Sequence, residues 1–507
     1  MTNELITMIR RYLLNIAVVG ITVLFLSGCE KFLEEDMKNV ASPPKFYSTV
    51  DEAKAGVNGI YTVLYDFFSN SDFFVATEGS SDLMVMITER NLNGNYGYSP
   101  VAPGVGQEIW KYGYRGVMYA NSTITGITTS NLPKSEQDKL IAEAVTLRSL
   151  YYFILTNTFG GVPYWTGGYQ TENDVNQVVN LPRSDADSIR TALITDLEYH
   201  ASNLLEKAEG DNTGRVTQGL AYGLMAKMAL ANRDWEKARW AAEQVINMAS
   251  RGIYQLLPDY GDIYKVKNNE ESIFEIQYAY SMTGLQRSHQ VYSWCMPGGK
   301  NGSVYDGVDL GDSLATTYGS IRPTKRLEGY YASNDKRKEH VLSSGYIDAT
   351  LKTFKNFNRY KNSGRYWLGP KFWDIHANNL ASGRNIMFMR YADVVLMMAE
   401  SLIELDDLSG AKFYIDMIRK RANVGAISVT DQPTMREELR IERAKELAGE
   451  YTRKWDLIRW GIFYESIKSV ATDYAAAAKN VRPYHMYYPI PSMEIVKNPA
   501  LRQNNGY

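Results

Sequence analysis

The sequence is poor in the residues that many enzymes and metal proteins use at their reactive centres. Its 507 residues include only two Cys and five His, at positions 200, 289, 340, 376 and 485. No two His stand four positions apart and no HExxH motif occurs, so a zinc site has no support. A GxSxG nucleophile elbow and a Walker-type phosphate loop are also absent. The sequence therefore offers no recognisable catalytic centre, and we expect no enzyme activity.

Charge of one sign is not in excess. Lys and Arg number 55 and Asp and Glu number 57, for a formal net charge of −2. A nucleic-acid-binding protein usually carries a basic face, so this balance argues against such a partner. Beyond the N-terminus no apolar run approaches the ~20 residues of a membrane-spanning helix. These features predict a soluble body that binds no nucleic acid.

The one long apolar run lies at the N-terminus. Two Arg, at positions 10 and 11, precede apolar residues 13–26. This order is typical of a secretory signal peptide, whose apolar part spans ~7–15 residues. The run ends in Leu-Ser-Gly-Cys at positions 26–29, which resembles the bacterial lipobox. We expect residues 1–28 to be a lipoprotein signal peptide and Cys29 to carry acyl chains such as palmitate that anchor the protein to a membrane. The alternative is a plain signal peptide with an accidental cysteine.

Residues 29–45 are polar, with three acids at positions 34–36 and two Pro at 43–44. This composition predicts a tether between the membrane and the folded body. If Cys29 is lipidated, Cys295 has no partner and no internal disulfide forms. Nothing in the sequence pairs Cys295 with a base, so we expect a bystander.

Helical patterns dominate from about residue 51. Ser135 and Asp138 have the spacing of a capping box and are expected to open a helix that ends at Gly160. A second helix is expected to bury one face, formed by Ile189, Leu193, Leu197, Ala201 and Leu204.

Two segments resemble each other at an offset of 173 residues. They are MAKMALANRDWEKARWAAEQVI at 225–246 and MAESLIELDDLSGAKFYIDMIR at 398–419. Each reads as a helix, a short polar turn with Asp, and a second helix entered through Ala. Small residues at matching places let two helices approach closely, as in a tetratricopeptide-like hairpin. Coincidence between two amphipathic helices is the alternative.

The chain between the two copies has a different character. Across residues 257–383 helical periodicity fades, and Gly, Asn, Ser and aromatic residues accumulate. A loop-rich insertion on a helical scaffold is a common place for function. We therefore divide the body into a helical first part (46–256), a ligand-binding insertion (257–383) and a C-terminal helical region (384–507). Within the insertion, Asp306, Asp309 and Asp312 do not form an EF-hand pattern; a structural calcium there stays an alternative to the expected absence of cofactors.

Several stretches resemble the SusD/RagB family in the family's own order. They are TEGSSDLM from residue 77, LRSLYYFILTNTFGGVPY from 147, RYADVVLMMAE from 390, ERAKELAGEYTRKWDLIRWG from 442 and YPIPSMEIVKNPALRQNNGY from 488. The resemblance implies a mainly helical SusD-like fold with four tetratricopeptide-like hairpins. It also implies a cell-surface lipoprotein of the outer membrane without catalysis of its own. Such proteins act in polysaccharide utilisation as lids of a SusC-like TonB-dependent transporter, and they capture nutrients, most often oligosaccharides.

The charged residues of the C-terminal stretch read as scaffold. Most of them fall at helical spacings, so opposite charges can pair: Glu442, Arg443, Glu446, Glu450, Arg453, Asp456 and Arg459. We expect them to hold Trp455 and Trp460 in the helical body. A charge cluster that binds ligand is the alternative.

Candidate ligand-binding residues follow from the chemistry of sugars, which present apolar C–H faces and a polar rim. The resemblance points to the loop after the SSDLM stretch and to loops of the insertion. On composition and position we choose Arg90, Asn93, Tyr96, Tyr98, Tyr292, Trp294, Tyr366, Trp367 and Trp373. Each aromatic residue could equally pack inside its loop.

The sequence leaves three hypotheses for the function of the protein. Capture of an oligosaccharide is the leading hypothesis, because flat aromatic rings and Asn suit sugars. Capture of peptides or another nutrient on the same scaffold is the runner-up. A glycoside hydrolase with a concealed carboxylate pair is the third, and nothing in the sequence singles such a pair out.

Overall fold

The computed structural model describes residues 46–169, 172–280, 288–296, 304–305, 308–309, 317–348, 350–356, 366–374, 376–377, 381–429 and 431–507. The signal peptide and the lipidation site Cys29 lie outside these residues. The carboxylates of the candidate calcium cluster at Asp306, Asp309 and Asp312 lie outside the description as well. Residues 47–507 form one compact unit.

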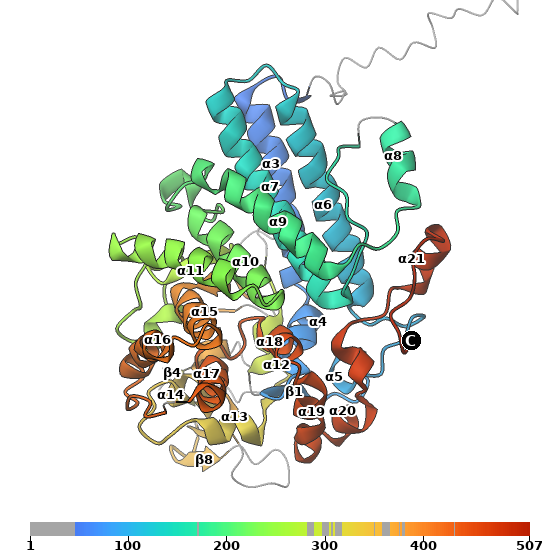
Figure 1. Ribbon diagram of the computed structural model, residues 1–507. Coiled ribbons are helices and arrows are strands. Elements are labelled where there is room, and N and C mark those ends of the chain that lie inside the picture. The colour runs from blue at the N-terminus through green and yellow to red at the C-terminus, as the bar shows by residue number, and fades with distance from the viewer. Residues whose placement is uncertain are drawn as a thin grey trace, which may run out of the picture. The chain divides into compact units, whose positions relative to one another are not determined.

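The first part of this unit is a layer of long helices (Figure 1). Helix α3 (Val50–Phe68) packs on α6 (Gly106–Thr128) and α7 (Lys134–Phe159), and α7 packs on α9 (Ala186–His200). A capping box opens α3, because Thr49 accepts from the Glu52 N–H and the Glu52 carboxylate accepts from the Thr49 N–H. The buried face expected for the second helix is confirmed on α9 and the turn that follows it.

Helix α7 corrects one expectation and confirms another. It begins at Lys134, with Pro133 as its N-cap, and no side chain caps it. The capping box expected at Ser135 and Asp138 is therefore wrong: the N-cap lies two residues earlier, at Pro133, and Asp138 pairs with Lys134 at 2.5 Å instead. The helix ends as expected at Gly160, whose φ of 73° lies in the left-handed region.

Both internal copies are helix pairs. Helix α10 (Gln218–Ala231) is followed by α11 (Trp235–Ser250), and α15 (Tyr391–Glu404) by α16 (Leu408–Arg421). The turns also match: Arg233 and Asp406 have φ of 58° and 65°, and the next residue in each turn is an Asp that caps the second helix. The copies therefore share local geometry, and α11 packs on α15. The expected set of four tetratricopeptide-like hairpins stays a prediction.

Short strands bring the two ends of the insertion together. Strand β2 (Ser272–Ile276) pairs antiparallel with β10 (Ile386–Arg390), and β1 (Met84–Met86) pairs with β5 (Ile321–Pro323). The other short strands are β3 (Val304–Tyr305), β4 (Val308–Asp309), β6 (Leu342–Ser343), β7 (Gly345–Ile347), β8 (Phe354–Asn356) and β9 (Trp367–Leu368). The pairing of β2 with β10 fixes the start and the end of the insertion beside each other.

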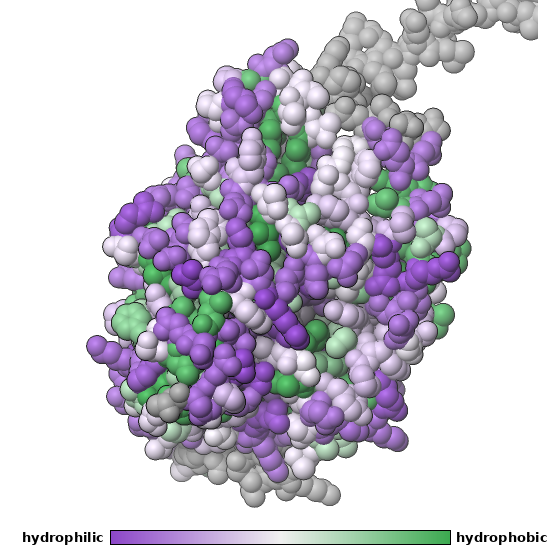
Figure 2. Space-filling model, viewed as in Figure 1, coloured by the Kyte–Doolittle hydropathy of each residue, from purple (hydrophilic) through white to green (hydrophobic). Residues whose placement is uncertain are grey.

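Shorter helices complete the unit. They are α4 (Ser71–Phe74), the π-helix η2 (Val75–Gly79), α5 (Leu92–Asn95), α8 (Glu172–Val179), α12 (Val291–Cys295), α13 (Lys325–Tyr330), α14 (Lys338–Val341), α17 (Gln432–Glu446), α18 (Arg453–Arg459), α19 (Phe463–Lys468), α20 (Ala475–Asn480) and α21 (Ser492–Lys497). Among the described helices none is long and apolar enough to cross a membrane. Hydrophilic side chains cover most of the face seen in Figure 2, with apolar side chains in separate spots.

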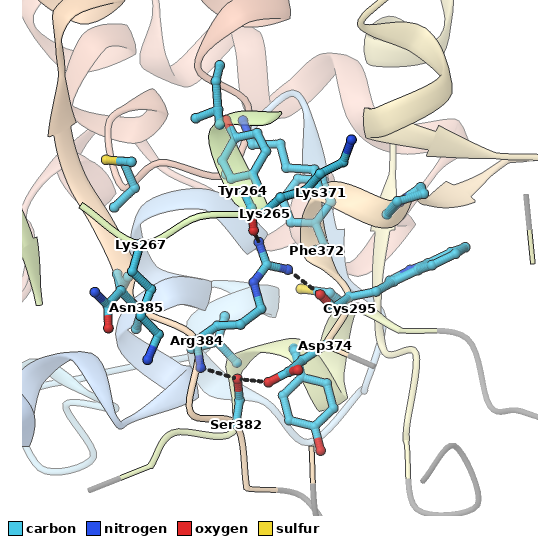
Figure 3. Close-up of a pocket in the computed structure, with 18 of the residues that line it drawn as sticks. Tyr264, Lys265, Lys267, Cys295, Lys371, Phe372, Asp374, Ser382, Arg384 and Asn385 are labelled. Carbon is cyan, nitrogen blue, oxygen red and sulfur yellow. Dashed lines mark hydrogen bonds between the residues drawn. The ribbon is translucent and has the colours of Figure 1, made fainter. Parts of the chain in front are cut away.

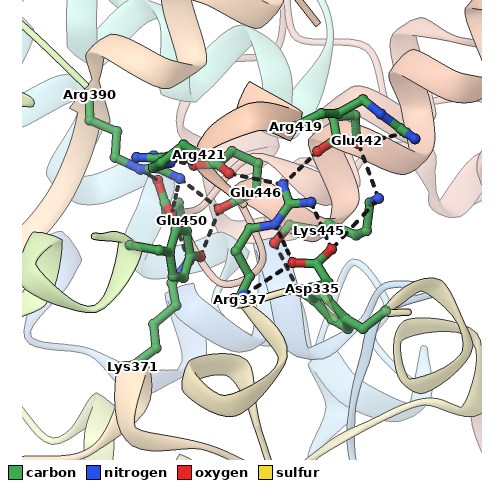
Figure 4. A network of polar contacts seen from close by, with 12 residues as sticks. Asp335, Arg337, Lys371, Arg390, Arg419, Arg421, Glu442, Lys445, Glu446 and Glu450 are labelled. Atoms are coloured by element: carbon green, nitrogen blue, oxygen red, sulfur yellow. Dashed lines mark hydrogen bonds and ion pairs between the residues drawn. The ribbon is translucent and has the colours of Figure 1, made fainter. Parts of the chain in front are cut away.

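A buried network of ion pairs joins the insertion to the C-terminal helices (Figure 4). Arg390, at the end of β10, is fully buried and bonds Glu271 at 2.6 Å, Glu446 at 2.6 Å and Glu450 at 2.8 Å. Arg421, from the end of α16, bonds Glu271 and Glu446 too. Glu271 precedes β2, Arg390 ends β10, Arg421 ends α16, and Glu446 and Glu450 lie at and just after the end of α17. The ion pairs therefore crosslink four separate segments of the chain.

The same network reaches deeper into the insertion. Arg337 is fully buried and bonds Asp335 at 2.8 Å, Glu442 at 2.6 Å and Glu446 at 3.0 Å. Glu446 thus pairs with three Arg side chains. Their positive charges outweigh the effect of burial and hold the pKa of Glu446 well below its usual range.

The expectation that the C-terminal charges serve as scaffold is confirmed. Most of their partners lie far away in the sequence: Arg453 bonds Asp82 at 2.7 Å, and Arg459 pairs with Glu400. Trp455 and Trp460 are half-buried against the core. The helical spacing that suggested pairing along one helix therefore reflects pairing between distant segments.

The C-terminal tail closes over a buried lysine. The Lys454 Nζ lies 4.8 Å from the ring centre of Tyr488, 5.2 Å from Tyr96, 5.4 Å from Phe463 and 5.8 Å from Tyr98. Within the described part of the chain it makes no hydrogen bond, and burial lowers its pKa from 10.5 to about 7. The four rings supply cation–π contacts in place of a carboxylate.

We expect Arg390→Met to lower the free energy of unfolding by roughly 3–5 kcal/mol, because it leaves buried carboxylates without their cation. Guanidinium unfolding followed by circular dichroism measures the change. The matched control is Arg239→Met, which removes an exposed pair with Glu236 and should cost less than ~1 kcal/mol. Equal effects of the two substitutions would contradict the central role of the network.

We expect Lys454→Met to raise the free energy of unfolding at pH 6 by about 2 kcal/mol. Each unit of pKa shift is worth ~1.4 kcal/mol, and the rings offset part of the cost. The unfolded chain keeps the proton up to about pH 10, so the native protein gains stability as pH rises from about 7, the pKa of folded Lys454. The difference in the free energy of unfolding between Lys454→Met and the native protein should therefore shrink as the pH rises from about 7 to about 10. Lys479→Met, at an exposed site, is the control; a difference independent of pH would overturn the prediction.

Candidate functional site

A cavity of about 600 Å³ lies where the insertion meets the C-terminal region (Figure 3). Most of its lining comes from two stretches of the chain, 261–295 and 370–387, with Phe74, His340 and residues 449–451 completing the wall. Its size fits a small part of an oligosaccharide or peptide.

The turn that forms one wall is held by a motif near the N-terminus. The buried carboxylate of Glu78, in η2, accepts from the backbone N–H of Gly449 at 3.0 Å, of Thr452 at 2.7 Å and of Arg453 at 3.0 Å. Gly449 has a φ of 80°, and a Cβ there would meet Phe372 at 2.2 Å. Position 449 therefore requires glycine. The Glu78 carboxylate satisfies the N–H groups of this turn, which would otherwise be buried without a hydrogen-bond acceptor.

A second wall connects the cavity to the buried ion-pair network. Lys371 donates to Glu450 at 2.7 Å and to the Tyr260 hydroxyl at 3.0 Å. Glu450 also binds Arg390. Lys371 and Glu450 both line the cavity, so this wall is fixed by the network behind it.

The third group of polar contacts centres on Asp374. Its carboxylate accepts from the Tyr280 hydroxyl at 2.6 Å, from the His376 N–H at 3.0 Å and from the Ser382 hydroxyl. The Arg384 N–H donates to the Ser382 hydroxyl at 3.2 Å, and the Arg384 guanidinium donates to the carbonyls of Trp373 and Tyr264. These bonds set the direction in which the Tyr280 ring stands.

His289 and Cys295 line the cavity but are poorly suited to catalysis. The His289 Nδ1 accepts from the Val291 N–H at 3.3 Å, and its Nε2 donates to the Arg384 carbonyl at 3.0 Å. Burial lowers the pKa of this imidazole to about 4 and raises the pKa of the Cys295 thiol. A base whose nitrogens are both engaged and a protonated thiol do not form a nucleophile pair.

Aromatic rings form much of the cavity surface. Tyr280 is 38% exposed, so part of its side chain is open to a ligand, and the Lys267 ammonium lies 5.8 Å from its ring centre. Tyr292 and Tyr451 each bring a buried hydroxyl that finds no hydrogen-bond partner among the residues the structure describes. An exposed ring beside polar side chains is an arrangement that suits a polyhydroxylated ligand.

Two of the residues chosen from the sequence line this cavity, Tyr292 and Trp373. Trp294 is half-buried on α12 and is not part of the lining. Trp367 is 2% exposed and stacks with the Arg322 guanidinium at 3.5 Å, while Tyr366 is half-buried under the Lys338 ammonium. The ligand-binding roles of these residues stay predictions.

The early loop lies away from the cavity. Tyr96 and Tyr98 are 2% and 3% exposed and pack around Lys454, so their faces are covered in this structure. Asn93 is buried, and its side-chain oxygen Oδ1 accepts from the Val105 N–H at 3.0 Å. Arg90 is exposed. None of the four lines the cavity.

The sequence reasoning missed several lining residues. Tyr264 and Tyr280 lie in the insertion and follow the same aromatic signal that selected Tyr292. Lys267, Arg384 and Asn385 gave no signal, because their placement depends on the pairing of β2 with β10. No group of three metal-ligating side chains occurs within the described ranges.

Two family models match the chain. Residues 351–507 match the SusD family, and residues 31–230 match a family described as "Starch-binding associating with outer membrane". Together these matches span both ends of the body and include the motifs at 77 and 442.

Known relatives match over most of the length. SusD-like protein P25 of Formosa agariphila is 26% identical over 534 residues, with 97% of this chain and 99% of the relative covered. The starch-binding protein SusD of Bacteroides thetaiotaomicron is 33% identical over 444 residues, with 75% of each chain covered.

Solved structures share the fold. A SusD homolog from Bacteroides thetaiotaomicron superposes with a TM-score of 0.76 at 21% identity, over 93% of this chain and all of the other. Surface glycan-binding protein A from the same species, in complex with laminarihexaose, gives a TM-score of 0.68 at 23% identity, over 90% and 99% of the two chains. The mainly helical SusD-like fold expected from the sequence is thus confirmed. With a relative one-third identical across three quarters of its length, and family matches at both ends, the chain belongs to the SusD family.

Proposed function

We propose that this protein binds an oligosaccharide in the cavity between the insertion and the 449–451 turn. The observation that carries the proposal is the exposed Tyr280 side chain in a cavity that polar side chains such as Lys267, Arg384 and Asn385 also line. A sugar residue would stack its C–H face on the ring and place its hydroxyls near these polar groups.

The relatives support this choice of ligand. One is a starch-binding protein, and a structural neighbour was solved with laminarihexaose. The engaged nitrogens of His289 and the protonated thiol of Cys295 favour binding without bond cleavage.

We further propose that the protein works at the cell surface. Lipid on Cys29 would anchor it to the outer membrane, in keeping with the family description and with the lipobox. There it would serve as the lid of a SusC-like TonB-dependent transporter and deliver captured glycan for import. A single weak site is sufficient for this role, since closure on the transporter raises the effective concentration of the ligand.

Isothermal titration of the purified full-length protein in detergent with plant, host and microbial oligosaccharides tests the binding proposal. We expect heat of binding for at least one glycan class. Tyr280→Ala should weaken that binding about tenfold or more, because ring stacking contributes ~1–3 kcal/mol. Tyr280→Phe keeps the ring and should retain most of the affinity.

The matched control is Tyr199→Ala, which removes a 78% exposed ring on α9, outside the cavity. It should leave binding unchanged. Equal loss in both variants, or binding that persists in Tyr280→Ala, would remove the cavity as the site. A response to a peptide mixture alone would overturn glycan binding in favour of peptide capture.

A further inference from the structure

More cationic than acidic side chains line the cavity. Four cationic side chains line it. Lys265 pairs with Asp262 and Lys371 with Glu450, both at or near 2.8 Å. Lys267 and Arg384 differ from these two, because within the described part of the chain neither makes an ion pair.

The partners of these two cations are neutral carbonyls. The Lys267 ammonium donates to the Tyr278 carbonyl at 2.6 Å, and the Arg384 guanidinium donates to the carbonyls of Trp373 and Tyr264. A guanidinium has five N–H donors, so Arg384 keeps donors that these bonds do not use. Burial lowers the pKa of both groups and outweighs the opposite effect of the Asp374 and Glu275 carboxylates.

The carboxylates of the lining are already engaged. Glu450 is held by Arg390 and Lys371. Asp374 accepts three hydrogen bonds from protein groups. Glu275 accepts from Asn385 at 2.8 Å and from the Asn268 N–H at 2.9 Å, and burial raises its pKa.

The two cations face the same space. Both side chains line the cavity, and the Lys267 ammonium lies 5.8 Å from the ring centre of Tyr280. Figure 3 shows them with Asn385 at one side of the cavity. His289 is neutral at physiological pH, so it adds no charge.

From this arrangement we infer that the ligand is an acidic oligosaccharide, whose carboxylate or sulfate group binds between Lys267 and Arg384 while a sugar ring stacks on Tyr280. Arg384 presents the planar donor fork that suits such oxyanions. The inference rests on the proposed function, because it names the class of glycan for the same cavity.

The test compares each acidic glycan with its neutral counterpart. Oligogalacturonate, alginate and glucuronate-bearing oligomers are titrated beside their carboxyl-reduced forms, and sulfated oligomers beside their desulfated forms. The purified full-length protein should bind at least one acidic member about tenfold more tightly than its neutral partner. The arm that shows this preference identifies carboxylate or sulfate as the group recognised.

Lys267→Gln should abolish the preference for the acidic member over its neutral partner. Lys265→Gln is the matched control, since Lys265 lines the same cavity but already pairs with Asp262; it should retain the preference. Raising the salt concentration should weaken binding of the acidic member and not that of its neutral partner.

The outcomes separate the two proposals. Equal binding of acidic and neutral partners, lost in Tyr280→Ala, would overturn the acidic class and keep glycan binding in the cavity. A preference that survives Lys267→Gln would overturn the placement of the acidic group. Absence of binding to every acidic and neutral glycan would overturn both proposals.

Discussion

The structure depends on a set of buried charges at the meeting point of the insertion and the C-terminal helices. Arg390 and Arg337 are fully buried, and each is balanced by carboxylates from several segments. Such a network gains little net stability over an apolar core, but breaking it is costly because a partner is left charged. Arrangements of these segments that leave one of the charges buried and unpaired are therefore disfavoured.

This constraint explains why a loop-rich insertion can hold a defined cavity. Glu450 belongs to the network and also lines the cavity, and Lys371 reaches it from the insertion. Glu78 holds the adjoining turn through three N–H bonds. The wall is therefore set by buried ionic and hydrogen-bonded groups, while the ring of Tyr280 and the cations Lys267 and Arg384 are left to meet a ligand.

The aromatic content of the loops led to two different uses. Tyr292 and Trp373 line the cavity, whereas Tyr96 and Tyr98 pack around the Lys454 ammonium under the C-terminal tail. All four had the same appearance in the sequence: an aromatic residue in a loop with polar neighbours. What distinguishes them is which distant segment covers the ring, and a single sequence carries no record of that.

The sequence by itself determined the helical scaffold, the two matching helix pairs and their Asp caps, because periodicity and capping are local. It also determined the family, through motifs that retain their order. Only the tertiary structure decided that Glu78 meets Gly449, that Arg390 meets Glu450, and that Lys267 and Arg384 face one cavity. These contacts join residues more than 50 positions apart. Burying charges and N–H groups costs free energy, and only the complete fold brings together the partners that offset this cost.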